Sequence, residues 1–90
     1  MSEGKVTTDH AKIRRWAEER GGVPATVKNT ESASGPGILR LDFAPKDDAL
    51  EQVGWNAFFE KFEKEKLAFL YQDRTDSGEM SRFHKFINRS

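Results

Sequence analysis

The sequence predicts an α+β fold, a two-layer sandwich in which two amphipathic helices cover one face of a small antiparallel sheet. Three observations predict this fold class. The chain has 90 residues, which is room for a single domain. Two segments place apolar residues at helical spacing, and short segments between and after them alternate apolar with polar residues. The expected order is α-β-β-α-β-β, with residues 7–89 forming the domain and residues 1–6 a flexible tail.

The composition indicates a small core that is rich in aromatic rings. The residue types AVILMFWYC account for 36% of the chain. Seven Phe, two Trp and one Tyr compensate for this low share, because each ring buries a large area. Fifteen basic and fifteen acidic residues give a formal net charge of zero, so no overall field favours a nucleic-acid or membrane partner.

The first predicted helix begins after Thr8 or Asp9, either of which is a favourable N-cap residue. Gly21 and Gly22 end it, because glycine adopts the left-handed C-terminal conformation without steric cost. Its apolar stripe consists of Ile13, Trp16, Ala17 and the stem of Arg20.

Two strands are expected between the helices. Residues 24–29 alternate apolar and polar side chains, and Pro24 at the start indicates an edge strand or a strand entry. The composition of residues 30–37 is that of a loop. Residues 37–43, with the sequence GILRLDF, show the clearest strand alternation in the chain. An acidic loop with room for one helical turn is expected over residues 44–52.

The second predicted helix carries an aromatic stripe that consists of Trp55, Phe58, Phe59 and Phe62. The following apolar run, LAFLYQ, has the length of a strand and is expected to be central, with both faces covered. Because each lies in the middle of its stripe, Trp16 and Phe59 are both expected to be mostly buried.

The C-terminal segment is compatible with two structures. The favoured one is a hairpin that turns through residues 76–78 and places Tyr71 opposite Arg82 and Arg74 opposite Glu79. The alternative is a C-terminal helix in place of the last strand, since the apolar residues at helical spacing are Met80, Phe83 and Ile87.

No arrangement for catalysis or metal binding is apparent in the sequence. The chain has no cysteine, so a disulfide framework and thiolate-held metals are excluded. His10 and His84 lie far apart and in no metal-binding motif, and the serines lack the context of a nucleophile. We therefore expect no enzyme activity, no cofactor and no metal. No apolar run has the length of a spanning helix or a signal peptide, so a cytoplasmic location is expected.

One surface is a candidate for anion or nucleic-acid binding. If the first helix and the last strand are neighbours, their basic residues form one face, and two rings lie close enough to stack on bases. The residues of this candidate face are Arg14, Arg15, Tyr71, Arg82, His84, Lys85 and Arg89.

Several segments resemble a family of small stand-alone bacterial proteins of about this length. These segments are DHAKIRRWAEERGGVPATVK, GILRLDF, WNAFFEKFEKEKLAFLYQ and SRFHKF. Some members carry the label 1,4-alpha-glucan branching enzyme, which implies a multi-domain protein with a catalytic barrel, and 90 residues are too few for one. The chain departs from the family at Gly54 and Asn56, where a serine and an acidic residue are expected. The resemblance implies the domain boundaries and no mechanism.

The function that the sequence favours is a non-enzymatic module that binds a protein partner or self-associates. The basis is an extended edge at residues 24–29 or 80–87 that can pair with another chain. Weak nucleic-acid binding through the basic face is the alternative, and a carbohydrate-related enzyme is a remote third.

Overall fold

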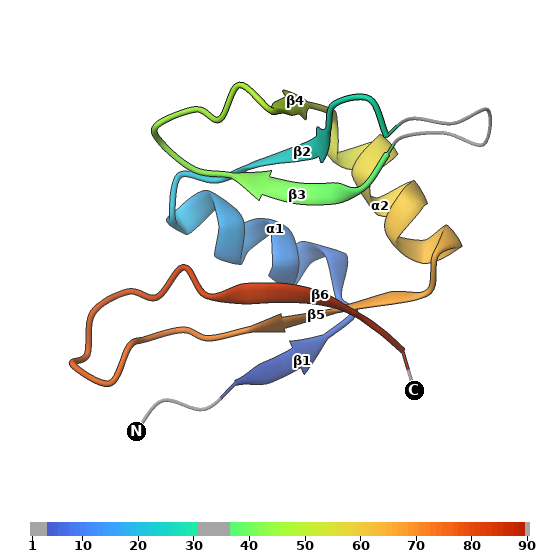
Figure 1. Cartoon of the computed structure of the whole chain (residues 1–90). Helices are drawn as coiled ribbons and strands as arrows, with labels where there is room; N and C mark the ends of the chain where they lie inside the picture. Colours follow the sequence, from blue (N-terminus) through green and yellow to red (C-terminus); the bar gives the residue numbers. More distant parts are fainter. Residues whose placement is uncertain (1–3, 31–36, 90) are drawn as a thin grey trace.

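The computed structural model describes residues 4–30 and 37–89. Within these residues the elements are β1 (Lys5–Thr7), α1 (His10–Glu19), β2 (Val23–Val27), β3 (Leu39–Asp42), β4 (Leu50–Gln52), α2 (Trp55–Lys64), β5 (Leu67–Tyr71) and β6 (His84–Asn88), as Figure 1 shows. The predicted α+β class is confirmed. The strands form two antiparallel sheets, in the orders β1-β5-β6 and β3-β2-β4, in place of the expected single sheet.

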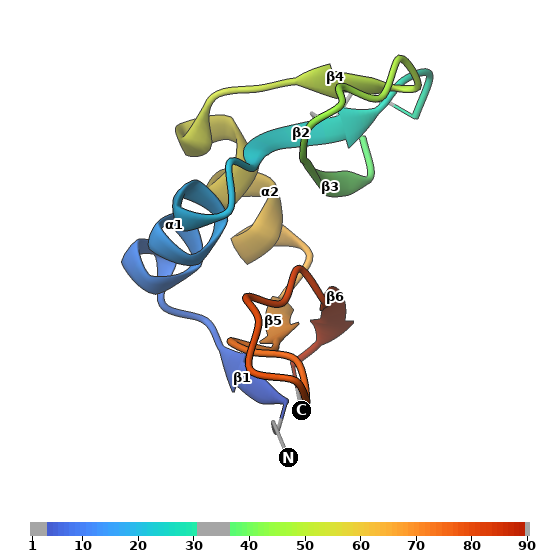
Figure 2. The same ribbon diagram turned by 90° about the vertical axis from the view of Figure 1, so that its left-hand side faces the viewer.

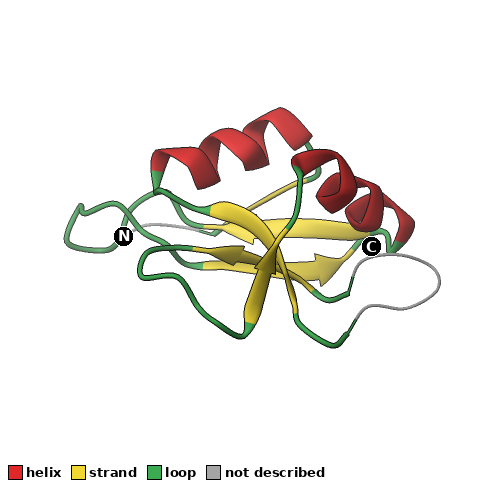
Figure 3. Cartoon of the chain, turned by 90° about the horizontal axis from the view of Figure 1, so that it is seen from above, coloured by secondary structure: helices red, strands yellow, loops and turns green. Residues whose placement is uncertain are grey.

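Both helices lie on the same side of the strands when the molecule is seen from above (Figure 3). Seen from the side, the helices lie between the two sheets (Figure 2). The apolar stripes of both helices therefore face a shared core, whose largest members include Ile13, Trp16, Leu39, Leu41, Phe58, Phe62, Phe69 and Tyr71.

The two side chains expected to be buried have different environments. Trp16 is buried, and its ring packs edge-on against Phe69 at a centroid distance of 5.2 Å. Phe59 is only half-buried, because it lies at the flank of α2 and stacks on His10 at a centroid distance of 4.1 Å. Its neighbour Phe58 points into the core instead.

The first helix has the predicted caps. Asp9 is the N-cap residue, and its carboxylate accepts a hydrogen bond of 3.2 Å from the backbone N–H of Lys12. Gly21 takes a φ of 73°, in the left-handed region, as expected of a glycine that ends a helix.

The hairpin between β5 and β6 is confirmed, since residues 84–88 form a strand rather than a helix. Its register differs from the prediction by two residues, because Tyr71 pairs with His84 rather than with Arg82. A shift of two residues preserves the faces of a strand, so Tyr71 and His84 share one face.

The two additional residues of the hairpin have separate causes. One lies in the turn, where Arg74 forms a bridge with Met80, one residue beyond Glu79. The other is Arg82, which forms a bulge between two successive hydrogen bonds of the hairpin, Ser81 N–H to Asp73 O and Gln72 N–H to Phe83 O. The pattern of apolar residues in the sequence does not predict either of these two additional residues.

β2 is the central strand of its sheet, so the edge expected at residues 24–29 is wrong. It pairs with β3 on one side and with β4 on the other. Pro24 is accommodated because its carbonyl accepts the N–H of Val53 just beyond the last β4 pair, and the ladder lacks only the bond that a Pro24 N–H would donate.

Two short strands were not predicted. β1 contains Lys5 and Val6, which were expected in the flexible tail, and it pairs with β5. β4 lies in the segment expected to be an acidic loop. Each has three residues, which is too few for an alternating pattern to be recognised. β1 supplies hydrogen-bond partners to the side of β5 that faces away from β6, and β4 does the same for the side of β2 that faces away from β3. Of the expected loop at 30–37, residues 31–36 lie outside the described residues.

Candidate functional site

The residues predicted to form one basic and aromatic face do not share a surface. Arg14 and Arg15 are exposed on α1, where Arg14 forms an ion pair with Glu18 at 3.2 Å. Lys85 is exposed on the side of the β1-β5-β6 sheet that faces away from the helices, because it alternates with the inward-facing His84.

The two remaining basic residues are held in separate places. The guanidinium of Arg82 lies over the ring of Phe43 at 5.4 Å. Arg89 follows β6, and it donates hydrogen bonds of 2.7 Å to the carboxylate of Glu63 and to the carbonyl of Leu67. Their charges therefore do not add to those on α1.

The two rings expected to stack on bases belong to the core. Tyr71 is buried, and His84 is half-buried, with its ring stacked on Phe69 at 5.7 Å. Burial lowers the pKa of His84, so the imidazole is held neutral. Among the predicted residues, the structure brings together Arg15 and Tyr71, which line a recess beside α1.

The outer edge of β6 is unpaired. The order β1-β5-β6 places β6 at the end of its sheet, and no strand of the described chain pairs with its other side. Gln72 donates to Phe83, and Arg89 donates to Lys66, so the odd-numbered residues of this segment bond to β5. In an antiparallel pair, the backbone groups of the alternate residues then point away from β5. These residues are His84, Phe86 and Asn88.

The sheet face beside this edge carries exposed apolar side chains. Val6 is 58% exposed and Phe83 is 51% exposed, while Leu70 and Ile87 are half-buried on the same face. Both helices lie on the opposite side of the β1-β5-β6 sheet, as Figure 2 shows. No helix or strand of the described chain covers this face.

The charge along the β6 segment has one sign. Residues 80–89 contain no acidic side chain, and their basic side chains are Arg82, Lys85 and Arg89. The segment therefore combines unpaired backbone groups, an exposed phenylalanine and a local positive charge.

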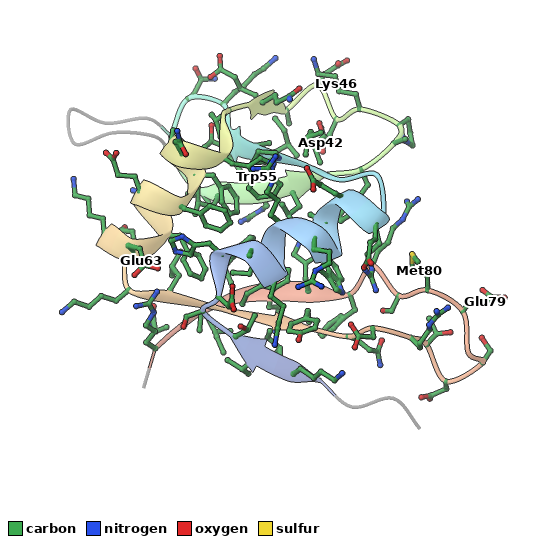
Figure 4. The ribbon with its side chains drawn as sticks, turned by 180° about the vertical axis from the view of Figure 1, so that it is seen from behind. Asp42, Lys46, Trp55, Glu63, Glu79 and Met80 are labelled. Carbon is green, nitrogen blue, oxygen red and sulfur yellow. The ribbon has the colours of Figure 1, made fainter. Side chains whose placement is uncertain are left out.

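A separate ionic cluster joins the two ends of the fold. Glu63, in the last turns of α2 (Figure 4), accepts 2.7 Å contacts from His10 Nε2 and from Arg89. These hydrogen bonds, first from Arg89 and then from His10, lower the pKa of Glu63 to about 2. All three side chains are partly exposed, and no nucleophile lies among the three. The cluster therefore has a structural role, in which it links α1, α2 and the end of β6.

Two further findings concern the described residues only. They contain no group of three or more His, Cys, Asp or Glu side chains placed to hold a metal ion. Neither helix in this part of the chain has the length and apolar character needed to cross a membrane.

The edge expected at residues 80–87 includes most of β6, whereas two basic residues that also line the recess, Lys5 and Lys12, were not among the predicted site residues. Lys12 had a readable signal, because it lies at helical spacing from Arg15 and Glu19. Lys5 had none, because its position depends on the pairing of β1 with β5. Comparisons of the chain with known protein families, with curated proteins and with solved structures found no match.

Proposed function

We propose that the protein is a protein-binding module that accepts an extended acidic segment of a partner as an additional strand on β6. The unpaired outer edge of β6 carries this proposal. In strand addition, main-chain hydrogen bonds supply affinity, and alternate side chains supply specificity. The outward backbone groups of His84, Phe86 and Asn88 are the donors and acceptors that such a strand needs.

β6 is favoured over the other sheet edges because of its length. It has five residues, compared with three in β1, four in β3 and three in β4. A longer edge offers more main-chain hydrogen bonds to a partner. A strand added there places half of its side chains next to Phe83 and Ile87 on the exposed face.

The charge of the edge favours an acidic partner over a second copy of the chain. Antiparallel pairing of two β6 strands brings together the basic side chains of both copies, and like charges on neighbouring strands are destabilising. The side chains concerned are Arg82 and Lys85, since the charge of Arg89 is paired with Glu63. A partner strand with alternating apolar and acidic residues matches both the charge and the exposed apolar face.

A peptide-binding experiment tests this proposal. Isotope-labelled protein is titrated with two sets of short peptides. In one set apolar residues alternate with acidic residues, and in the other they alternate with basic residues. The backbone amide shifts of the protein are followed by NMR. We expect the acidic peptides to shift the amides of His84, Phe86 and Asn88 and to slow their hydrogen exchange. Asn88→Pro removes an outward N–H that has no partner in β5, so it should abolish binding. Asn88→Ala retains the N–H and serves as the matched control.

Two outcomes contradict the proposal. One is equal binding of acidic peptides by the wild type and by Asn88→Pro, because main-chain pairing at this edge is then not involved. The other is a concentration-dependent dimer in sedimentation velocity that Asn88→Pro returns to a monomer, which identifies a second copy as the occupant. Lys85→Glu should reverse the preference from acidic to basic peptides.

A further inference from the structure

A recess opens between α1, β1 and the end of β5. Its volume is about 290 Å³, near the lower limit of roughly 300 Å³ for small-molecule sites. It is therefore large enough for one compact group rather than for a large ligand. Its lining residues are Lys5, Lys12, Arg15, Trp16, Glu19, Tyr71 and Asp73.

Local structure accounts for the way in which three elements meet in this recess. Lys12, Arg15 and Glu19 follow one another at helical spacing, so they lie along one side of α1. Lys5 on β1 is the cross-strand partner of Tyr71 on β5, and partners of this kind project from the same face of a sheet.

The charges in the recess do not cancel. Asp73 is engaged by Lys5, with 2.6 Å between Oδ2 and Nζ, and Glu19 lies 3.6 Å from a guanidinium nitrogen of Arg20. The hydrogen bond and the charge of Asp73 raise the pKa of Lys5, so Lys5 stays protonated in this pair. Lys12 and Arg15 form no ion pair with any carboxylate of the described residues. Two positive charges therefore remain uncompensated.

Tyr71 adds a neutral hydrogen-bonding group to the recess. Tyr71 is only 6% exposed, yet it lines the recess. Within the described residues, its hydroxyl has no hydrogen-bond partner, whereas the Trp16 indole N–H beside it donates to the carbonyl of Gln72. Because no buried side-chain oxygen of the described residues lacks a partner, this hydroxyl is reached by solvent and can donate to a ligand atom in the recess.

We infer that the recess binds one phosphate-type dianion, either inorganic phosphate or the phosphate group of a small monoester, between Lys12 and Arg15. The guanidinium of Arg15 can donate two parallel hydrogen bonds to such a group, Lys12 supplies a point charge, and the Tyr71 hydroxyl supplies a neutral donor. The recess is open on one side, so the remainder of a monoester extends into solvent. This site is independent of the β6 edge.

The position of the other basic residues argues against a nucleic-acid backbone as the ligand. A polyanion is held by a track of successive cations. Here Lys85 lies on the far face of the sheet, Arg82 lies over Phe43, and Arg89 is engaged by Glu63. The recess is thus an isolated site for one anionic group.

Titration with inorganic phosphate and with phenyl phosphate tests this inference, with the amide shifts of α1 and β5 followed by NMR. We expect saturable shifts around the recess. Tyr71→Phe removes only the hydroxyl, and it should weaken binding about tenfold, because a hydrogen bond to a charged group contributes about 1.5 kcal/mol or more. Arg15→Gln should weaken binding at least as much. Because Arg15 is exposed, this variant should fold, and it tests the inference even if Tyr71→Phe does not fold.

Arg14→Gln is the matched control, since it removes the same charge from the same helix outside the recess. It should leave the affinity within about twofold of the wild type, as surface charges away from a site contribute little. An equal loss in Arg14→Gln and Arg15→Gln would overturn the inference, and so would the absence of saturable shifts in the wild type. A short single-stranded DNA that binds more tightly than phenyl phosphate, with a steep dependence on salt, would identify a nucleic-acid site instead.

Discussion

At the scale of single residues, the position of a side chain within an apolar stripe does not settle its depth. Trp16 and Phe59 both occupy the middle of a stripe, but Trp16 alone packs between Phe69 of β5 and Phe43, which follows β3. Phe59 is covered mainly by His10 and Trp55, at the rim of the helix pair.

The first stability prediction follows from this difference. Trp16→Ala should lower the free energy of unfolding by about 3–5 kcal/mol, because it leaves a large cavity. That loss approaches the whole stability of a small domain. Phe59→Ala should cost less, since its ring is already half-exposed. Urea denaturation of both variants measures the two costs, and an equal loss would show that Phe59 is as central as Trp16.

At the scale of elements, Arg20 connects the end of α1 to the β5–β6 hairpin. Its guanidinium lies over Trp16 at 4.2 Å and is buried. It donates hydrogen bonds to three backbone carbonyls, those of Trp16, Asp73 and Ser81. Two of the three belong to the hairpin, so one side chain fixes the hairpin against the helix.

Arg20→Met should therefore destabilise the hairpin more than the rest of the fold. The substitution keeps much of the apolar contact with Trp16 but removes three hydrogen bonds to carbonyls, and the carbonyl of Asp73 keeps another donor, the N–H of Ser81. We expect a cost of about 2 kcal/mol or more. Amide hydrogen exchange should accelerate most in residues 73–83. Arg14→Met, on the exposed side of the same helix, is the control and should change little. Uniform acceleration across all elements would contradict this role.

At the scale of the whole molecule, the ionic cluster at Glu63 joins three segments that are distant in sequence. His10 begins α1, Glu63 lies near the end of α2, and Arg89 follows β6. The cluster therefore holds the two helices and the C-terminal strand in one arrangement, and its strength depends on the charge of one carboxylate.

The stability of the whole fold should depend on this carboxylate in acid. The pKa of Glu63 is about 2 in the folded state, against 4.5 for an unperturbed group. The unfolded state thus binds the proton more readily, so the contribution of Glu63 is present above about pH 4.5 and is lost as the pH falls toward 2. Thermal melts across this range should show a smaller fall in Tm for Glu63→Gln than for the wild type. Parallel curves would contradict the prediction.

The sequence by itself determined the two helices, the caps of α1 and the β3 and β5 segments, and it favoured the C-terminal hairpin over a C-terminal helix. These features depend on residues that are close in the chain: the side chain of Asp9, the φ of Gly21 and the alternation from Leu39 to Phe43. Local spacing and local hydrogen bonds are readable without knowledge of the fold. That β6 has a free edge follows instead from the strand order β1-β5-β6, which is set by long-range pairing.

Only the tertiary structure decided which strands are central, which rings are exposed and which charges meet. The division into two sheets makes β2 central, although Pro24 suggested an edge. The inner face of the β5–β6 hairpin packs on Trp16, so Tyr71 and His84 belong to the core rather than to a stacking surface. Lys5 reaches the recess only because β1 pairs with β5. Such contacts join residues far apart in the chain, and the burial that selects among them is a property of the whole packed molecule.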